Sequence, residues 1–481
     1  MKFTEETIAA IDESPVPDRN ASIRLSNLVV VILIGLCAFF VFRTGGDITA
    51  KVAIGLGILV LSFFPAIQWT KHNRTWFPAF ELFCLSAAAF YGLPLLLEHS
   101  TLAEFSDGVV SRSGLYVVAF LACATIGFSI ERQKPRAPAW ATASLLPEFA
   151  YRYIPLGVLA HTGYLYLDGF TELIPFEYEG PLRALFFGIG TLCTFVMAKL
   201  WGLRALPERT AGLFVANLIL QLILQFSQLY LIGGISLLAL ALISFASARR
   251  SVPWLVITVS IPLLAVLHQG KSQMRSIYWS GGKPLPTLTD LPSFFIEWVD
   301  YGVNPIEVAE TAEEQKRTSI FERASLIQML CLTVDRVPDV KPFLDGESYV
   351  DIPAQVIPRQ LWPDKPSSLL ANIRLAIHFD LVDPENAMSV SIAFGMIAEA
   401  YCNFGGAGVV VLGFIVGLGF RQVSMLSLGT AQFSALGILM ILLTAWSFQA
   451  ELVLATWIAS IFQASAVCIG VPLVYRQFTT R

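Results

Sequence analysis

The chain has 481 residues, of which 55% are apolar and only 14% are charged, and its mean hydropathy is +0.65. Soluble proteins carry about 25% charged residues, so this composition excludes an ordinary soluble domain and indicates a polytopic all-α membrane protein. The net charge of −4 is close to neutral for this length and gives no sign of nucleic-acid binding.

The first 26 residues are polar and carry five acidic side chains, and no apolar run begins before Leu28. A secretory signal peptide has its apolar stretch directly after a short basic start. We therefore expect no cleavable signal peptide and predict that residues 1–26 form a cytoplasmic tail.

Apolar segments of membrane-spanning length recur along the rest of the chain. A spanning helix needs about 20 apolar residues, with a range of roughly 17–25. Nine such segments fall within residues 27–268, and three more follow a helical or re-entrant stretch within residues 391–474. The twelve predicted spans are residues 27–42, 52–69, 76–97, 113–130, 151–169, 182–200, 211–230, 233–248, 252–268, 405–421, 432–449 and 451–474.

Lysine and arginine alternate between the two sides of these predicted spans. If the N-terminus is cytoplasmic, the cytoplasmic loops hold most of the cations, and the opposite short loops are mainly acidic. The tail at residues 475–481 is then cytoplasmic too, and we expect a multi-pass protein of a bacterial inner membrane. The opposite short loops hold only Arg43, Lys51 and Arg112 as cations.

Residues 269–390 form a polar interval on the non-cytoplasmic side. Loops longer than about 15 residues without structure of their own are usually functional or disordered. This interval does not have a disordered composition, because aromatic residues such as Trp279, Trp298 and Trp362 recur in it. We predict a folded periplasmic cap with short helices that lie over the membrane.

A helix is predicted from Glu314 to Val334, and Arg323 falls on its apolar face. A guanidinium on a packed or membrane-proximal surface needs an anion. Arg323 therefore either binds an anionic substrate or has a structural role, reaching water or pairing with a carboxylate.

The run Ile357 to Pro366 contains three prolines and cannot be helix interior. Its prolines stiffen the loop that carries Arg359 and Lys365, and Trp362 is typical of a membrane interface. Such a pair of cations can bind a phosphate or diphosphate. The alternative is an interfacial loop that touches ordinary phospholipid headgroups.

Lys271 and Arg275 directly follow the ninth predicted span. They either join the same cationic site or anchor the end of a helix.

Glu399 lies in a mostly apolar segment, and Asn403 is one helical turn further along on the same side. Ionisable groups at membrane depth are costly and are often functional. A partly buried carboxylate there can act as a general base toward a hydroxyl, or it can be a structural partner of a loop arginine. His378 and His268 border the interval and are alternative bases.

Several catalytic signatures are absent from the sequence, including a Walker loop, H-E-x-x-H, G-x-S-x-G and a dinucleotide fingerprint. No Asp-x-Asp pair occurs in the predicted outer loops. We therefore expect neither a metal ion nor a cofactor, and arginine and lysine would stabilise a phosphate leaving group instead.

Four motifs follow one another between residues 318 and 412. They are Arg323, Pro342-Phe343-Leu344-x-Gly346-x-Ser348-Tyr349, Ile357-Pro358-Arg359-x-Leu361-Trp362-Pro363-x-Lys365-Pro366 and Ala398-Glu399-Ala400-Tyr401-x-Asn403-Phe404-Gly405-x-x-Gly408. In this order they resemble the Wzy-type O-antigen and exopolysaccharide repeat-unit polymerases. Cys402 stands where that pattern leads us to expect an apolar residue.

The resemblance implies a GT-C-like membrane glycosyltransferase of the O-antigen polymerase and ligase type, with undecaprenyl-diphosphate-linked oligosaccharides as donor and acceptor. Arg323, Arg359 and Lys365 would hold the diphosphate, and Glu399, or else His378, would accept the hydroxyl proton. Lys271, Arg275, Asn403, Tyr401 and Trp362 are further candidates for contacts with the diphosphate or glycan. Membrane lipids, a chain-length regulator and a flippase are the other expected partners.

Two other functions stay open at this stage. A flippase or transporter for a lipid-linked glycan would show an inverted repeat and broken helices near the midplane. An O-antigen ligase would share the chemistry and differ in its acceptor.

Overall fold

The computed structural model describes most of the chain. The described residues are 19–72, 77–130, 136–146, 153–171, 173–174, 176–249, 251–280, 283–284, 286–304, 325–357, 362, 364–367, 369–382 and 392–479.

The described part of the chain is almost entirely helical, and its one β-bridge, between Ser144 and Ser434, is isolated. Ten helices in it are long and apolar enough to cross a membrane. They are α2 (Arg19–Arg43), α3 (Ala50–His72), α4 (Ala79–Ala87) with its continuation to Leu96, α6 (Asp107–Ser129), α8 (Phe176–Gly202), α9 (Glu208–Phe226), α10 (Leu231–Arg249), α11 (Trp254–Arg275), α17 (Gly395–Ser427) and α19 (Leu454–Ser465) with its continuation through α20 (Val471–Thr479).

Each of the twelve predicted spans contains a helix, but two of these helices are shorter than the rest. They are α7 (Ile154–Phe170), with 17 residues, and α18 (Ala435–Trp446), with 12. The prediction of a polytopic helical membrane protein is confirmed in part, because ten helices of the described residues are long and apolar enough to cross a membrane.

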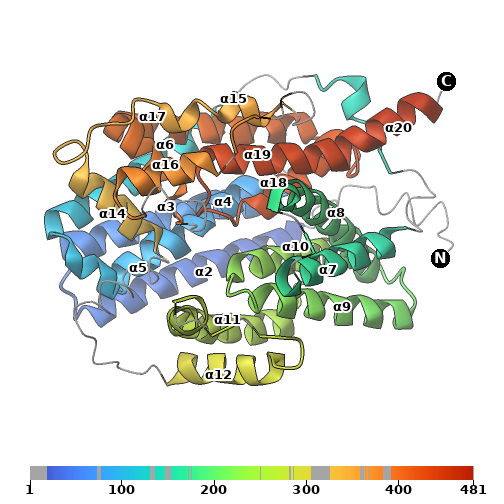
Figure 1. Ribbon diagram of the computed structural model, residues 1–481, viewed down its shortest axis with the longest axis horizontal. Coiled ribbons are helices and arrows are strands. Elements are labelled where there is room, and N and C mark those ends of the chain that lie inside the picture. Colours follow the sequence, from blue (N-terminus) through green and yellow to red (C-terminus); the bar gives the residue numbers. More distant parts are fainter. Residues whose placement is uncertain are drawn as a thin grey trace.

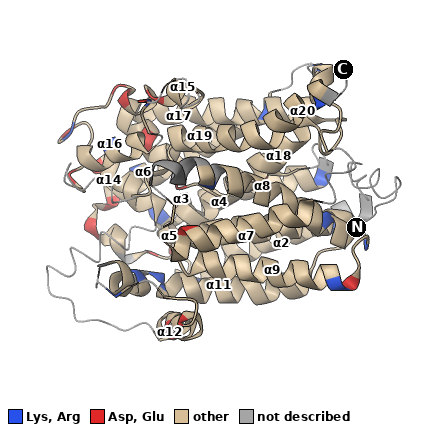
Figure 2. Ribbon diagram, turned by 45° about the vertical axis from the view of Figure 1, so that its right-hand side comes forward, with Lys and Arg blue, Asp and Glu red and all other residues tan. Residues whose placement is uncertain are grey.

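The long helices lie side by side in one bundle (Figure 1). In both ribbon views α2 begins and α20 ends at one end of the bundle, while α14 (Leu326–Arg336) and α16 (Leu370–His378) lie toward the other. Charged residues gather near the ends of the helices, and the helix middles carry few of them (Figure 2). This distribution is what a bilayer requires, because apolar side chains face lipid while charges stay at the interfaces.

Glycines bring the backbones of α6 and α17 into direct contact. A Cβ added at Gly413 or Gly417 would collide with the carbonyl of Phe120 or Ala124, and one at Gly127 would collide with that of Phe414. Small residues four apart are the usual means of such close packing between membrane helices. Gly413 and Gly417 therefore form a seam at which α17 packs directly on α6.

The polar interval contributes short helices that pack against the bundle. α14 buries Ile327, Leu330 and Val334, and it packs on α6 and α17. The predicted helix from Glu314 to Val334 is therefore present from Leu326 onwards; residues 305–324, with Arg323, lie outside the described residues. Two other short helices of the interval lie elsewhere, namely α12 (Leu291–Val303), which packs on α11, and α15 (Ile352–Gln355), which packs on α19.

α17 changes direction near its start. Phe404 and Gly405 leave helical geometry, and Gly405 has φ of +60°, which favours glycine. The kink separates the buried first turns, which carry Glu399 and Asn403, from the long apolar part of α17.

Candidate functional site

Glu399 lies in the second turn of α17 and is fully buried. Its two carboxylate oxygens both accept hydrogen bonds from protein groups. Ser348 Oγ donates to Oε1 over 2.9 Å, and the backbone N–H of Leu454 donates to Oε2 over 2.7 Å. Leu454 is the first residue of α19, so the carboxylate lies at a helix N-terminus, where negative charge is favoured.

Asn403 lies one turn after Glu399, and the predicted placement of both on one side of the helix is confirmed. Its amide nitrogen donates to the carbonyl of Glu399 and to Ser348 Oγ, each over 2.8 Å. Its amide oxygen accepts the N–H of Gly346 over 3.0 Å. Gly346 has φ of +94°, so the turn before Ser348 requires glycine.

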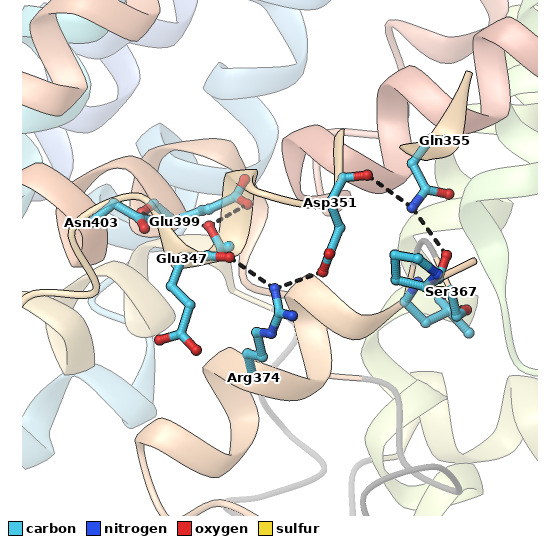
Figure 3. A network of polar contacts seen from close by, with 10 residues as sticks. Glu347, Asp351, Gln355, Ser367, Arg374, Glu399 and Asn403 are labelled. Atoms are coloured by element: carbon cyan, nitrogen blue, oxygen red, sulfur yellow. Dashed lines mark hydrogen bonds and ion pairs between the residues drawn. The ribbon is translucent and has the colours of Figure 1, made fainter. Parts of the chain in front are cut away.

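Arg374 on α16 holds the segment that contains Ser348 (Figure 3). Its Nη1 donates to the carbonyl of Glu347 over 2.8 Å and forms an ion pair of 2.6 Å with Asp351 Oδ2. Gln355 continues this network by donating to the carbonyls of Asp351 and Pro366. Arg374 thus connects α16 to the segment on both sides of Ser348.

A second group of charges lies where α11 ends and the turn between α18 and α19 passes. Glu451 in this turn is half-buried, and its backbone carbonyl accepts the N–H of Gly395 over 3.1 Å. Burial raises the pKa of Glu451 to about 7, while the charges of Lys271 and Arg275 oppose that increase. The three side chains are thus within electrostatic reach of one another.

Aromatic rings and a carbonyl fix the guanidinium of Arg275. Its Nη2 donates to the carbonyl of Leu229 over 2.8 Å, and its central carbon lies 4.3 Å from the ring centroid of Trp279 and 5.5 Å from that of Tyr230. In the described structure Nε of Arg275 has no hydrogen-bond partner. An arginine held in this way can present its remaining N–H groups to an anion without losing much freedom.

The histidines take different positions. His268 lies within electrostatic reach of Lys271, Arg275 and His99, so it flanks the second charged group. His378 ends α16, where burial first and then Lys341 lower its pKa. His378 makes no contact with Glu399 among the described residues.

The other candidate residues are more dispersed. Tyr401 points away from Glu399, with its hydroxyl 3.4 Å from the Val337 carbonyl and its ring against Tyr116. Lys365 donates to the carbonyl of Ile357 over 2.9 Å, and Trp362 is exposed. Arg359, like Arg323, lies outside the described residues.

A protein-family model described as a domain of unknown function (DUF8712) matches residues 158–442, which is more than half of the chain. The chain belongs to the DUF8712 family. No curated protein and no solved structure matches it. The DUF8712 region begins within α7 and ends within α18, so it includes Lys271, Arg275 and Glu399 and stops before Glu451.

Two residues of this site escaped the sequence analysis, and only one of them carries a signal. Glu451 is the sole acidic residue after Glu399, and it lies between two apolar segments, nine residues after the end of the DUF8712 region. An isolated acid between two apolar segments is itself a pointer to function. Ser348 has no such signal, because its contact with Glu399 spans 51 residues.

Proposed function

We propose that this protein is a bacterial inner-membrane glycosyltransferase of GT-C-like plan that polymerises undecaprenyl-diphosphate-linked oligosaccharide repeat units on the periplasmic face. One observation carries the proposal. Lys271 and Arg275 lie within electrostatic reach of Glu451, whose pKa is about 7, at the end of α11. The resemblance of residues 318–412 to Wzy-type polymerases supports the same reaction.

Such a site has the groups that the reaction needs. The acceptor hydroxyl oxygen attacks the anomeric carbon of the donor glycan, and the bond from that carbon to the diphosphate oxygen breaks. The electron pair leaves on the diphosphate, where Lys271 and Arg275 stabilise the charge. The proton of the hydroxyl passes to Glu451, whose pKa near the working pH suits a general base.

The proposal shifts the role of base from Glu399 to Glu451. Both oxygens of Glu399 already accept hydrogen bonds from Ser348 and Leu454, and the side chain is fully buried. Glu451 is partly exposed and lies within electrostatic reach of two cations. Arg323, Arg359 and Lys365 remain candidates for further contacts with the diphosphate or glycan.

The test uses purified full-length protein in lipid nanodiscs, a synthetic undecaprenyl-diphosphate oligosaccharide and EDTA, with polymer length measured on gels. We expect polymerisation by the wild type. Glu451→Gln should lower kcat by about 10²–10⁴-fold, as for loss of a general base, and Arg275→Ala by about 10²–10³-fold.

Two exposed residues provide matched controls. Glu208→Gln and Arg249→Ala change the same charges at the start of α9 and the end of α10, and both should polymerise like the wild type. No polymer from the wild type, together with movement of the lipid-linked substrate across the bilayer, would instead indicate a flippase. Transfer of preformed chains to another lipid acceptor would indicate a ligase.

A further inference from the structure

The turn between α18 and α19, which carries Glu451, is attached to the first turns of α17 at two points. The Gly395 N–H donates to the carbonyl of Glu451 over 3.1 Å. Three residues later, the Leu454 N–H donates to Glu399 Oε2 over 2.7 Å. One helix therefore holds the backbone from the Glu451 carbonyl to Leu454.

The first attachment depends on glycine. Gly395 has φ of +74°, and a Cβ there would lie about 3.0 Å from Tyr91 Oη and 3.1 Å from the carbonyl of Ala450. A larger residue would be strained by its backbone and crowded by both neighbours. Glycine thus lets α17 begin directly against the turn.

The second attachment depends on a chain of buried polar groups. Ser348 and Asn403 are fully buried, like Glu399. Ser348 donates to Glu399 and accepts from Asn403, so the carboxylate is held in one orientation. A buried hydrogen-bonded network of this kind fixes geometry because each unmade bond is costly.

We propose that Glu399 is a positioning residue that, with Ser348, holds the α18–α19 turn so that Glu451 faces Lys271 and Arg275. The inference rests on the function proposed above, because it gives Glu451 the role of proton acceptor. Glu399 then acts through Leu454 and does not touch the substrate. The polar interval contributes Ser348, so its folding and the placement of the base are coupled.

The first readout is the pH dependence of kcat/KM for Glu399→Gln, which keeps the shape of the side chain and removes its charge. The charged groups within electrostatic reach of Glu451 are Lys271 and Arg275 on α11, and His268 lies within reach of both cations and of His99. The acidic limb of the pH–rate profile is the range in which kcat/KM rises as the base loses its proton. If the turn moves away from these cations, this limb moves to higher pH, because the cations hold the pKa of Glu451 down. We expect this shift together with a fall in kcat on the order of 10²-fold and little change in KM.

Ser348→Ala provides a milder second variant, and it should shift the limb in the same direction by a smaller amount. Loss of kcat with an unmoved limb in both variants would overturn the proposal, since the effect would then be a general structural one. Disappearance of the limb in Glu399→Gln would overturn it in another way, by making Glu399 itself the base.

A measurement without catalysis separates this inference from the proposed function. The melting temperature is compared between proteins with and without Glu451→Gln, in the wild-type and Glu399→Gln backgrounds, from about pH 5 to about pH 9. The two curves separate from about pH 4.5 upward, and the pH at which their difference stops growing reports the pKa of Glu451 in the folded protein. An upward shift of that pH in the Glu399→Gln background supports the positioning role even if no polymer forms, and an unchanged pH contradicts it.

Discussion

Ser348 Oγ donates a hydrogen bond of 2.9 Å to Glu399 Oε1, although 51 residues separate the two along the chain. Both side chains are fully buried. The bond joins the polar interval to the first turns of α17, and through Leu454 it continues to α19. The interval is therefore attached to the membrane bundle through a specific polar contact as well as by apolar packing.

Glu399→Ala should destabilise the protein by about 1–3 kcal/mol, because it leaves the Leu454 N–H and the Ser348 hydroxyl buried without an acceptor. Thermal unfolding in detergent, followed by circular dichroism, measures this change. Glu208→Ala is the matched control, since Glu208 is exposed at the start of α9. Equal melting temperatures for the two variants would contradict the predicted contribution of Glu399.

Gly417→Ala should destabilise the α6–α17 contact by about 1–3 kcal/mol, because its Cβ would collide with the Ala124 carbonyl. Gly419 lies two residues later on the same helix, and a Cβ there meets nothing within 4 Å. Gly419→Ala should therefore leave stability unchanged or raise it slightly. The comparison of the two melting temperatures checks the seam, and a similar effect of both changes would count against it.

Trp279→Leu should weaken the binding of inorganic pyrophosphate, because it removes the ring 4.3 Å from the Arg275 guanidinium. A cation–π contact is worth about 0.5–2 kcal/mol. Because the contact is present before the ligand binds, its loss weakens binding only through the freedom that the guanidinium gains, by at most roughly 2–30-fold in the dissociation constant. Isothermal titration of the nanodisc-embedded protein measures it.

The control is Trp254→Leu, at the opposite end of α11, which should bind like the wild type. In an Arg275→Ala background, Trp279→Leu should have no further effect. A further loss of affinity there would mean that the ring contacts the ligand directly.

Glu451→Gln should raise the melting temperature above about pH 7 and have little effect near pH 5. Since the pKa of Glu451 rises from 4.5 to about 7 on folding, the folded protein binds this proton more tightly than the unfolded chain does. Its contribution to stability is full below about pH 4.5 and is lost as the pH rises through 7. Melting curves at several pH values test this, and a gain confined to acidic pH would contradict the predicted direction.

The sequence alone was sufficient to predict a helical membrane protein, because long apolar runs are compatible with few other structures. It also predicted that Glu399 and Asn403 share one side of a helix, since spacing within a helix is local. It could not predict that Leu454 and Ser348 bind Glu399, because these contacts depend on how distant segments pack. Tyr401, two residues from Glu399, points elsewhere, as helical geometry itself requires.

The structure brings Lys271 and Arg275 near Glu451. From the sequence alone, these two cations could equally have served to anchor the end of a helix. Lys271 and Arg275 lie at the end of α11, and Glu451 lies in the turn between α18 and α19. About 180 residues separate them, so their proximity depends on tertiary packing and on no local motif.

The seam of Gly413 and Gly417 also restricts how the molecule can move. Two backbones in direct contact leave no room for a larger side chain between them, so the part of α17 after its kink stays close to α6. Glu399 and the first turns of α17 lie on the other side of that kink, at Phe404 and Gly405. A change in the angle of the kink would therefore move Glu399, and the turn attached to it, relative to the seam.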